Sequence, residues 1–198
     1  MNRMEYDLVG EMAVDADAYY GIHALRAAEN FPITHTRLPG DMIVSMAWIK
    51  KACARANRVT GALSSRVAEA IERACDELID GKLHDQFIVD PIQGGAGTST
   101  NMNANEVIAN RAIELLGGVK GDYTLVHPND HVNCGQSTND IYPTCVKMTL
   151  YRASEGLQRE MEALVSVLEK RAADFDGVIK MGRTQLQDAV PMTYGQEF

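Results

Sequence analysis

The sequence has no block of consecutive basic residues, no long apolar run and no hydrophobic signal near its start, and each absence excludes a class of protein. Its 198 residues carry 19 Lys and Arg against 27 Asp and Glu, a formal net charge of −8. Nucleic acids and anionic membranes are bound through clustered positive charge. A membrane-spanning helix needs about 20 apolar residues. We therefore expect a cytoplasmic protein that binds neither nucleic acid nor membrane.

Cysteine is scarce and lacks the spacing of a metal site or of a disulfide framework. The chain has 4 cysteines, which lie mostly among apolar or small residues. They are Cys53, Cys75, Cys134 and Cys145. His127 and His131 are also close in sequence, but Pro128 lies between them and no acidic or cysteine ligand follows at a matching offset. We expect reduced thiols and no metal site.

Hydrophobic residues recur at helical spacing over most of the chain, whereas residues 1–40 show no sustained period and read as an extended arm with short elements. The pattern predicts one helix from Asp41 to just before Gly61 and a second from Ser64 to just before Gly81. The two helices are expected to form a helical hairpin. The predicted fold class is therefore mainly α, with a mixed but mostly helical N-terminal domain.

A third helix is predicted after a glycine-rich turn at residues 94–97. Asn103 stands where it could cap this helix, with Glu106 three residues later in the reciprocal capping position. The pair Gly117-Gly118 marks the end of the helix. This arrangement places the glycine-rich turn at the N-terminal end of a helix.

The longest regular pattern follows Pro143 and is typical of a helical bundle. It consists of an apolar seam formed by Leu150, Leu157, Met161, Leu164, Leu168 and Phe175. A helix of about 30 residues would be about 45 Å long, too long to be covered by the rest of this chain, so it needs partner helices from elsewhere. We place a domain boundary near residue 140, with residues 1–140 as the N-terminal domain and residues 141–198 as the first part of a long-helix bundle domain.

Three separate segments are dense in neutral hydrogen-bond donors: residues 94–101, 133–140 and 182–193. The first lacks the lysine that a P-loop requires after Gly97, and Thr100 stands where a dinucleotide site requires a third small residue. What remains is a turn that directs backbone N–H groups and the positive end of a helix dipole at an anion such as a carboxylate. Taken singly, the first two segments are equally well explained as an ordinary turn and an ordinary N-cap.

Many neutral donors without a metal or an evident acid–base pair suit one kind of chemistry. Removing a proton from the carbon next to a carboxylate produces an aci-carboxylate dianion, which preorganised hydroxyl, amide and backbone N–H donors stabilise as its charge develops. A dicarboxylate substrate would need two anion pockets, which accounts for more than one such segment. Arg183 either binds an anion as well or holds a neighbouring carboxylate in an ion pair.

The chain closely resembles the aspartase/fumarase superfamily over nearly its whole length. The resemblance is carried by Asp85-Gln86-Phe87, residues 93–112, residues 127–133, Gln136 to Asp140 and Lys180 to Phe198. Within the superfamily, the turn from Gly94 to Ser99 is similar to that of the aspartases, whereas fumarases tend to carry a Gly-Ser-Gly-Thr-Gln version. Gln185 points the same way, since many aspartases have glutamine there, whereas fumarases and some aspartases have histidine. The resemblance implies an ammonia-lyase that converts L-aspartate to fumarate and ammonia, with fumarate hydratase as the alternative.

The resemblance also implies roles for individual residues. The substrate carboxylates and amino group would be held by Thr98, Ser99, Ser137, Thr138, Asn139, Thr184 and Gln185. A second dicarboxylate site, known from fumarases, would correspond to His127, Asn129 and Asp130. The family forms homotetramers in which three subunits contribute to each active site, and its reaction requires no cofactor. Such a tetramer would supply the partner helices that the apolar seam needs.

One feature of the family is missing from these 198 residues. The catalytic base of the family is a serine on a mobile Gly-Ser-Ser-x-Met-Pro-x-Lys-x-Asn loop, and no such stretch occurs. We expect this base beyond Phe198, the chain being the N-terminal portion of a considerably longer enzyme and inactive by itself. The alternative from another class is a non-catalytic binding or assembly module that uses the same anion pockets or the same apolar seam.

Overall fold

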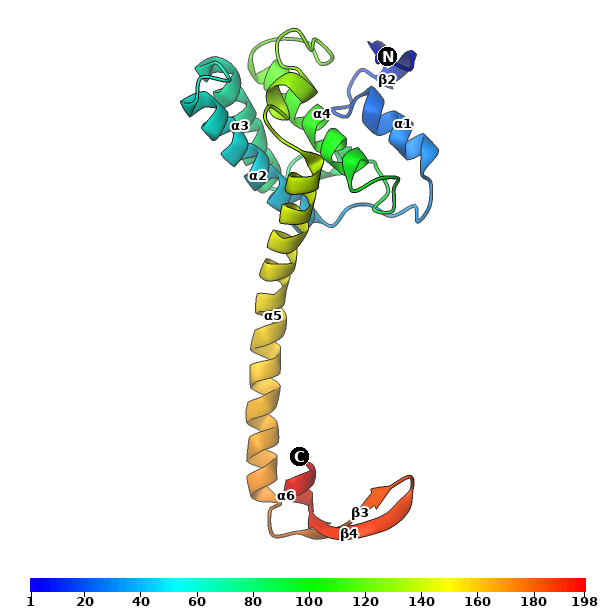
Figure 1. Ribbon diagram of the computed structural model, residues 1–198, viewed down its shortest axis with the longest axis vertical. Helices are drawn as coiled ribbons and strands as arrows, with labels where there is room; N and C mark the ends of the chain where they lie inside the picture. Colours follow the sequence, from blue (N-terminus) through cyan, green and yellow to red (C-terminus); the bar gives the residue numbers. More distant parts are fainter. The chain divides into compact units, whose positions relative to one another are not determined.

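The computed structural model describes residues 1–198 and divides them into two compact units, residues 1–149 and residues 150–198. The chain is mostly helical (Figure 1), which confirms the predicted fold class. No helix combines the length and the apolar composition that crossing a membrane requires. The domain boundary near residue 140 stays a prediction.

The first unit begins with a small hairpin, in which β1 (Asn2–Tyr6) pairs antiparallel with β2 (Glu11–Asp15) along its full length. The hairpin is followed by α1 (Ile22–Asn30). Arg3 joins these elements, because its guanidinium donates hydrogen bonds of 2.8 Å to the carbonyl oxygens of Asp15 and Tyr20. The predicted arm of short elements is thus ordered partly by Arg3 and partly by side chains from outside it, such as Gln86, whose oxygen accepts the Tyr19 N–H at 2.8 Å.

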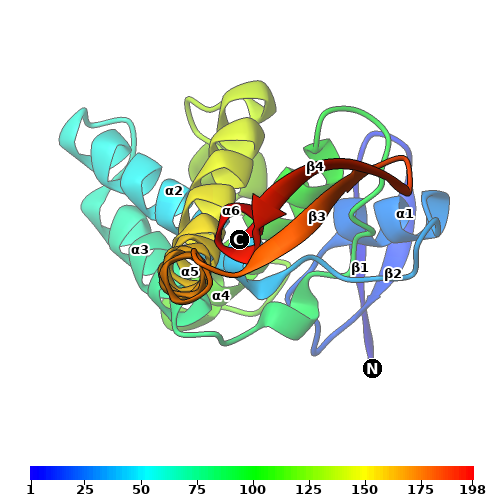
Figure 2. The ribbon, with the colours of Figure 1, turned by 90° about the horizontal axis from the view of Figure 1, so that it is seen from below.

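Helices α2 (Gly40–Val59) and α3 (Ser65–Ile79) pack side by side (Figure 1, Figure 2), which confirms the predicted helical hairpin. Ser64 caps α3 as expected, with its hydroxyl accepting the Val67 N–H at 3.3 Å. The faces of the two helices that meet belong to the main hydrophobic core. Its largest fully buried members include Met46, Ile71, Leu78, Phe87, Ile108 and Ile113.

Helix α4 (Thr98–Leu115) lies against α3 and α1, and its start corrects one prediction. Asn103 and Glu106 do not form a capping box, because the helix already begins after Gly97, whose left-handed φ of 88° suits glycine. Asn103 lies inside the helix and is fully buried. Its side-chain oxygen instead accepts the N–H of Ile88 at 2.9 Å, so it fixes a loop rather than a helix end.

The fully buried carboxylate of Glu106 caps a different helix. It accepts the backbone N–H groups of Gly21 at 2.9 Å, His23 at 2.8 Å and Ala24 at 3.0 Å, which are the unpaired donors at the start of α1. The His23 ring nitrogen Nδ1 also lies 3.0 Å from this carboxylate. The hydrogen bond to Glu106 raises the pKa of His23. Glu106 therefore attaches α1 to the centre of α4.

Two short helices, η1 (His84–Gln86) and η2 (Pro128–Val132), lie in the loops before and after α4. Helix α5 (Thr138–Asp174) follows and is 37 residues long. It begins before Pro143, so the proline lies within the helix rather than at its start. The segment rich in Ser, Thr and Asn therefore enters the first turn of α5, as its sequence predicted.

In the second unit, β3 (Ile179–Thr184) and β4 (Gln187–Thr193) form an antiparallel hairpin that leads into the short helix α6 (Tyr194–Glu197) (Figure 2). Gln185 and Leu186 make the turn, both with positive φ, 51° and 63°. Two successive left-handed residues match the twist of a tight two-residue hairpin. The donor-rich segment at residues 182–193 thus comprises the end of β3, the hairpin turn and the whole of β4.

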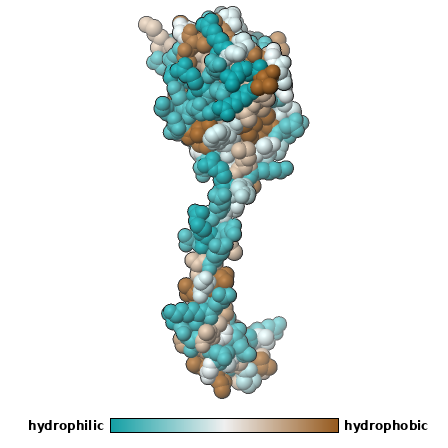
Figure 3. Space-filling model, turned by 90° about the vertical axis from the view of Figure 1, so that its left-hand side faces the viewer, coloured by the Kyte–Doolittle hydropathy of each residue, from teal (hydrophilic) through white to brown (hydrophobic).

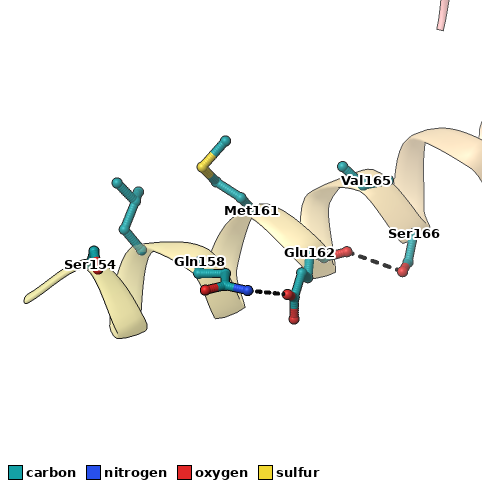
Figure 4. Close-up of a pocket in the computed structure, with 7 residues that line it drawn as sticks. Ser154, Gln158, Met161, Glu162, Val165 and Ser166 are labelled. Atoms are coloured by element: carbon teal, nitrogen blue, oxygen red, sulfur yellow. Dashed lines mark hydrogen bonds between the residues drawn. The ribbon is translucent and has the colours of Figure 1, made fainter. Parts of the chain in front are cut away.

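The predicted apolar seam of α5 is exposed. Hydrophobic residues lie at the surface of the second unit among hydrophilic ones (Figure 3). Leu157 is 63% exposed, and Met161 and Leu164 are each 57% exposed. Met161 and Val165 project from one side of the helix, and Gln158 and Glu162, which share a hydrogen bond of 2.9 Å, project from the other (Figure 4). This amphipathic pattern is typical of a helix that packs against other helices.

We expect residues 1–198 in isolation to self-associate through this seam, since soluble monomers rarely leave an apolar stripe of this length open. Sedimentation velocity at several concentrations measures the effect. The matched control replaces Leu157, Met161 and Leu164 with glutamate, which keeps helix propensity and should restore a monomer. Monomers at every concentration for the unsubstituted chain would contradict a bundle seam.

Candidate active site

The first candidate anion site is the start of α4. The Thr98 and Ser99 N–H groups have no hydrogen-bond acceptor within the chain, whereas the Thr100 N–H donates to the side-chain oxygen of Gln93 at 2.9 Å. Thr98 is exposed and Ser99 is half-buried. Two free N–H groups and two hydroxyls thus lie at the positive end of an 18-residue helix. This arrangement can bind a carboxylate.

The glycine-rich turn packs directly on the first turns of α5. A Cβ atom at Gly97 would lie 2.2 Å from Cγ of the Tyr142 ring, so a larger residue is excluded at this point. Gly95, Gly97, Asn139 and Tyr142 line one cavity together with neighbouring residues of both segments. The structure therefore brings two of the three donor-rich segments together, as a shared site requires.

The second candidate anion site is the start of α5. Ser137 and Asn139 are exposed, and the Asn139 N–H donates to the Ser137 hydroxyl at 3.2 Å. Thr138 is half-buried, and its hydroxyl oxygen accepts a hydrogen bond of 3.1 Å from the Asn101 side-chain amide. Because Asn101 belongs to α4, this bond ties the two helix starts to each other. Ser137, Thr138 and Asn139 can thus face a ligand held near the turn.

A buried lysine is hydrogen-bonded to the segment that precedes α5. Lys50 of α2 is fully buried, and its ammonium donates hydrogen bonds to the side-chain oxygens of Asn133 at 2.9 Å and Gln136 at 2.8 Å. Burial lowers the pKa of Lys50 to about 7. Sequence reasoning missed this residue. Its position on the apolar face of the helix, one turn after Met46, is the sequence feature that could have indicated its burial.

Thr184 and Gln185 belong to the second unit, at the tip of the β3–β4 hairpin, and both are exposed. Their participation in a site with the helix starts of the first unit stays a prediction. Arg183 pairs with a neighbouring carboxylate, since its Nε lies 3.0 Å from Asp188 Oδ1. Of the two interpretations left open for Arg183, the ion pair is the one present in the structure.

The residues of the predicted second dicarboxylate site lie together at η2. His127 caps this short helix, with its Nδ1 accepting the N–H groups of Asn129 at 3.2 Å and Asp130 at 3.1 Å. Asn129 and Asp130 are exposed, and His127 and Asn129 line a cavity that also includes His23 and Tyr123. Capping uses one ring nitrogen of His127. A role in binding a dicarboxylate stays a prediction.

Comparisons with known proteins find similar sequences over nearly the whole chain. A family model described as Lyase matches residues 10–198. The aspartate ammonia-lyase of Bacillus subtilis (strain 168) is 55% identical over 196 residues, which make up 99% of this chain and 41% of that protein. The chain therefore spans about two fifths of the length of the curated relatives it matches.

Two solved structures share the fold. The fumarate lyase:delta crystallin from Brucella melitensis in its native form has a TM-score of 0.91 and 51% identity, covering 100% of this chain and 46% of that chain. The recombinant class II fumarase from Schistosoma mansoni also has a TM-score of 0.91, with 39% identity, covering 100% of this chain and 42% of that chain. The fold is thus shared by a protein named fumarate lyase and by a class II fumarase. This chain has the higher sequence identity to the first, 51% against 39%.

Proposed function

This chain belongs to the lyase family, and on that premise we propose that the whole protein eliminates ammonia from L-aspartate to give fumarate. The observation that carries the choice of substrate is the higher identity to an aspartate ammonia-lyase than to a class II fumarase. Gln185, at the position where fumarases have histidine, supports the same choice. A non-catalytic binding module would use the same free donors at the starts of α4 and α5, so an assay of the whole protein is needed to separate the two functions.

In this proposal the two helix starts bind the two ends of a dicarboxylate. Thr98 and Ser99 donate to one carboxylate from the start of α4, and Ser137, Thr138 and Asn139 donate to the other end of the substrate from the start of α5. As the proton leaves the carbon next to a carboxylate, the developing aci-carboxylate charge strengthens these hydrogen bonds. The neutral donors therefore lower the barrier more than they tighten substrate binding.

The remaining parts of the proposed site come from outside the first unit. Thr184 and Gln185 complete the substrate contacts in an assembled homotetramer, whose subunits also cover the apolar seam of α5. The proton-abstracting serine lies on a loop outside these 198 residues. The elimination moves a proton and releases an amine without a change of redox state, so we propose that it needs no cofactor. A cytoplasmic location belongs to the same proposal.

The assay that tests the proposal follows fumarate by its ultraviolet absorbance, with L-aspartate and L-malate supplied in parallel to the whole protein. We expect fumarate from L-aspartate and a far slower reaction or none from L-malate. Faster turnover of L-malate would assign a fumarate hydratase instead. No fumarate from either substrate, with a folded protein, would favour a binding or assembly module.

A further inference from the structure

We propose that Lys50 is a positioning residue that sets the direction of the hydrogen bonds leading to Thr138. In this role Lys50 makes the Thr138 hydroxyl a donor toward the bound substrate. The proposal deepens the function given above and rests on it, since Thr138 is there a substrate-binding group. Lys50 itself does not contact the substrate.

The surroundings of Lys50 are unusual for a lysine. Its side chain is fully buried, and its two hydrogen-bond acceptors are the neutral amides of Asn133 and Gln136 rather than a carboxylate. The titratable groups that act on it are the thiols of Cys53 and Cys75, and burial raises the pKa of both thiols, which keeps them uncharged. A buried ammonium without a counter-charge is costly to a fold. Packing alone would be served better by an apolar residue.

A chain of hydrogen bonds connects Lys50 to Thr138 through Asn133 and Asn101. Asn133 Oδ1 accepts from Lys50 Nζ at 2.9 Å and from Asn101 Nδ2 at 3.1 Å. The second hydrogen of Asn101 Nδ2 is donated to the Thr138 hydroxyl oxygen at 3.1 Å. The oxygen of Asn101 is buried and accepts no hydrogen bond. Asn133 is therefore oriented by the donor Lys50, and Asn101 is oriented by the acceptor Asn133 Oδ1.

The orientation of these amides follows from the donors of Lys50. The Lys50 nitrogen donates to the side-chain oxygens of both Asn133 and Gln136, which uses two N–H groups and so holds for the ammonium and for the neutral amine alike. The oxygen of Asn133 must therefore face it. Asn101 can then approach that oxygen only with its NH₂ group. Because the same NH₂ group donates to the Thr138 oxygen, the hydroxyl hydrogen of Thr138 points elsewhere and remains available to an anion.

The variant that tests this role is Lys50→Met in the whole protein, which keeps the length of the side chain and removes its donors. Without Lys50 Nζ, the Asn133 amide keeps only the long hydrogen bond of 3.4 Å from its Nδ2 to the Gln136 carbonyl oxygen. Asn133 and Asn101 can then turn over, and the Thr138 hydroxyl can donate to Asn101 instead of to the substrate. We expect kcat/KM for L-aspartate to fall on the order of 10- to 100-fold, the usual effect of losing a hydrogen bond to a charged group.

The matched control is Lys51→Met, one residue further along the same helix. Lys51 forms an ion pair with Asp76 of α3 and has no contact with the amide chain. We expect its kcat/KM to stay within about 3-fold of the unsubstituted protein, as for most partly exposed ion pairs. Equal losses in both variants would overturn the proposal.

A double-mutant cycle with Thr138→Val separates a positioning role from a merely structural one. If Lys50 acts through Thr138, the double variant should lose little more than the worse single variant. Losses that multiply in full would show that the two residues act independently. Asn101→Asp provides a second test that leaves Lys50 in place. Since a carboxylate only accepts, the Thr138 hydroxyl would turn toward it, and an unchanged kcat/KM in this variant would overturn the proposal.

Hydrogen exchange of the free protein gives a measurement that does not depend on activity. Peptides covering residues 133–139 should exchange faster in Lys50→Met and not in Lys51→Met, because only the first variant releases this segment. Faster exchange in a protein that does not act on L-aspartate would reject the proposed function and retain the positioning of the segment. Unchanged exchange in Lys50→Met would reject the positioning role whatever the substrate.

Discussion

Replacing Thr98, Thr138 or Thr184 with valine in the whole protein should lower kcat for L-aspartate on the order of 10²-fold or more, equivalent to about 3 kcal/mol. Valine has nearly the size of threonine and removes only the hydroxyl group. If these hydroxyls bind the developing aci-carboxylate more strongly than the ground-state carboxylate, kcat should fall more than KM rises. Steady-state kinetics with L-aspartate measures both parameters.

Controls for this series come from the same part of the first unit. Substitution of Cys134 or His131, which we regard as structural, should cost far less than loss of a threonine hydroxyl. Circular dichroism of each variant establishes that it is folded. Near-normal turnover in all three threonine variants would mean that the donor-rich segments are ordinary caps and turns.

The structure explains why Thr98 and Thr138 belong to one series. Thr98 begins α4 immediately after the Gly97 turn, and Thr138 begins α5, against which that turn packs through Tyr142. The sequence predicted that both segments lie at helix starts, because glycine and short polar residues are local signals that need no tertiary information. Their proximity depends on the contact of Gly97 with Tyr142 and on the Asn101–Thr138 hydrogen bond, which are tertiary contacts.

The periodic pattern located α2 and α3 well and misplaced the start of α4. Asn103 and Glu106 have the spacing of a capping box, and that spacing is also consistent with two side chains inside a helix. The difference lies in long-range contacts. Asn103 accepts from Ile88, and Glu106 accepts from residues at the start of α1. A pattern read within one window cannot include such partners.

Lys50 shows the same limit in the candidate site. From the sequence alone a lysine is expected at the surface, because charged side chains are seldom fully buried. Its partners Asn133 and Gln136 lie more than 80 residues away along the chain, at separations of 83 and 86. Only its position on the apolar face of α2 hinted at burial. The amide chain that joins it to Thr138 depends on three segments that are distant in sequence, namely α2, α4 and the residues at the start of α5.

In the second unit, the donor-rich segment at residues 182–193 lies mostly in the strands of a hairpin. Gly182 and Pro191 bracket a polar stretch, which is typical of a turn, yet Pro191 is a member of β4 and lies opposite Met181 of β3. A proline fits on an edge strand where its missing N–H is not needed. The register also departs from regular pairing between Met181 and Arg183. Local composition was therefore right about the turn and wrong about its length.

Replacing Glu106 with alanine should destabilise the first unit by roughly 3–5 kcal/mol, the usual cost of removing one partner from a buried charged network. The carboxylate is 1% exposed, and its loss leaves the N–H groups of Gly21, His23 and Ala24 without an acceptor. Helix α1 would then lose one of the two carboxylates at its start, Glu5 still accepting the Ile22 N–H at 2.9 Å, and would lose the hydrogen bonds that attach it to α4.

Urea unfolding followed by circular dichroism measures this loss, in the chain made monomeric by the glutamate substitutions at the apolar seam. Glu69→Ala is the matched control, because Glu69 pairs with Arg58 at 3.2 Å and its side chain is 61% exposed. Surface pairs of this kind contribute about 0–1 kcal/mol. Since each buried N–H that loses its acceptor costs about 1–3 kcal/mol, the midpoint for Glu106→Ala should fall well below that of Glu69→Ala. Coincident midpoints would mean that water replaces the carboxylate at the start of α1, and that Glu106 does not hold the helix in place.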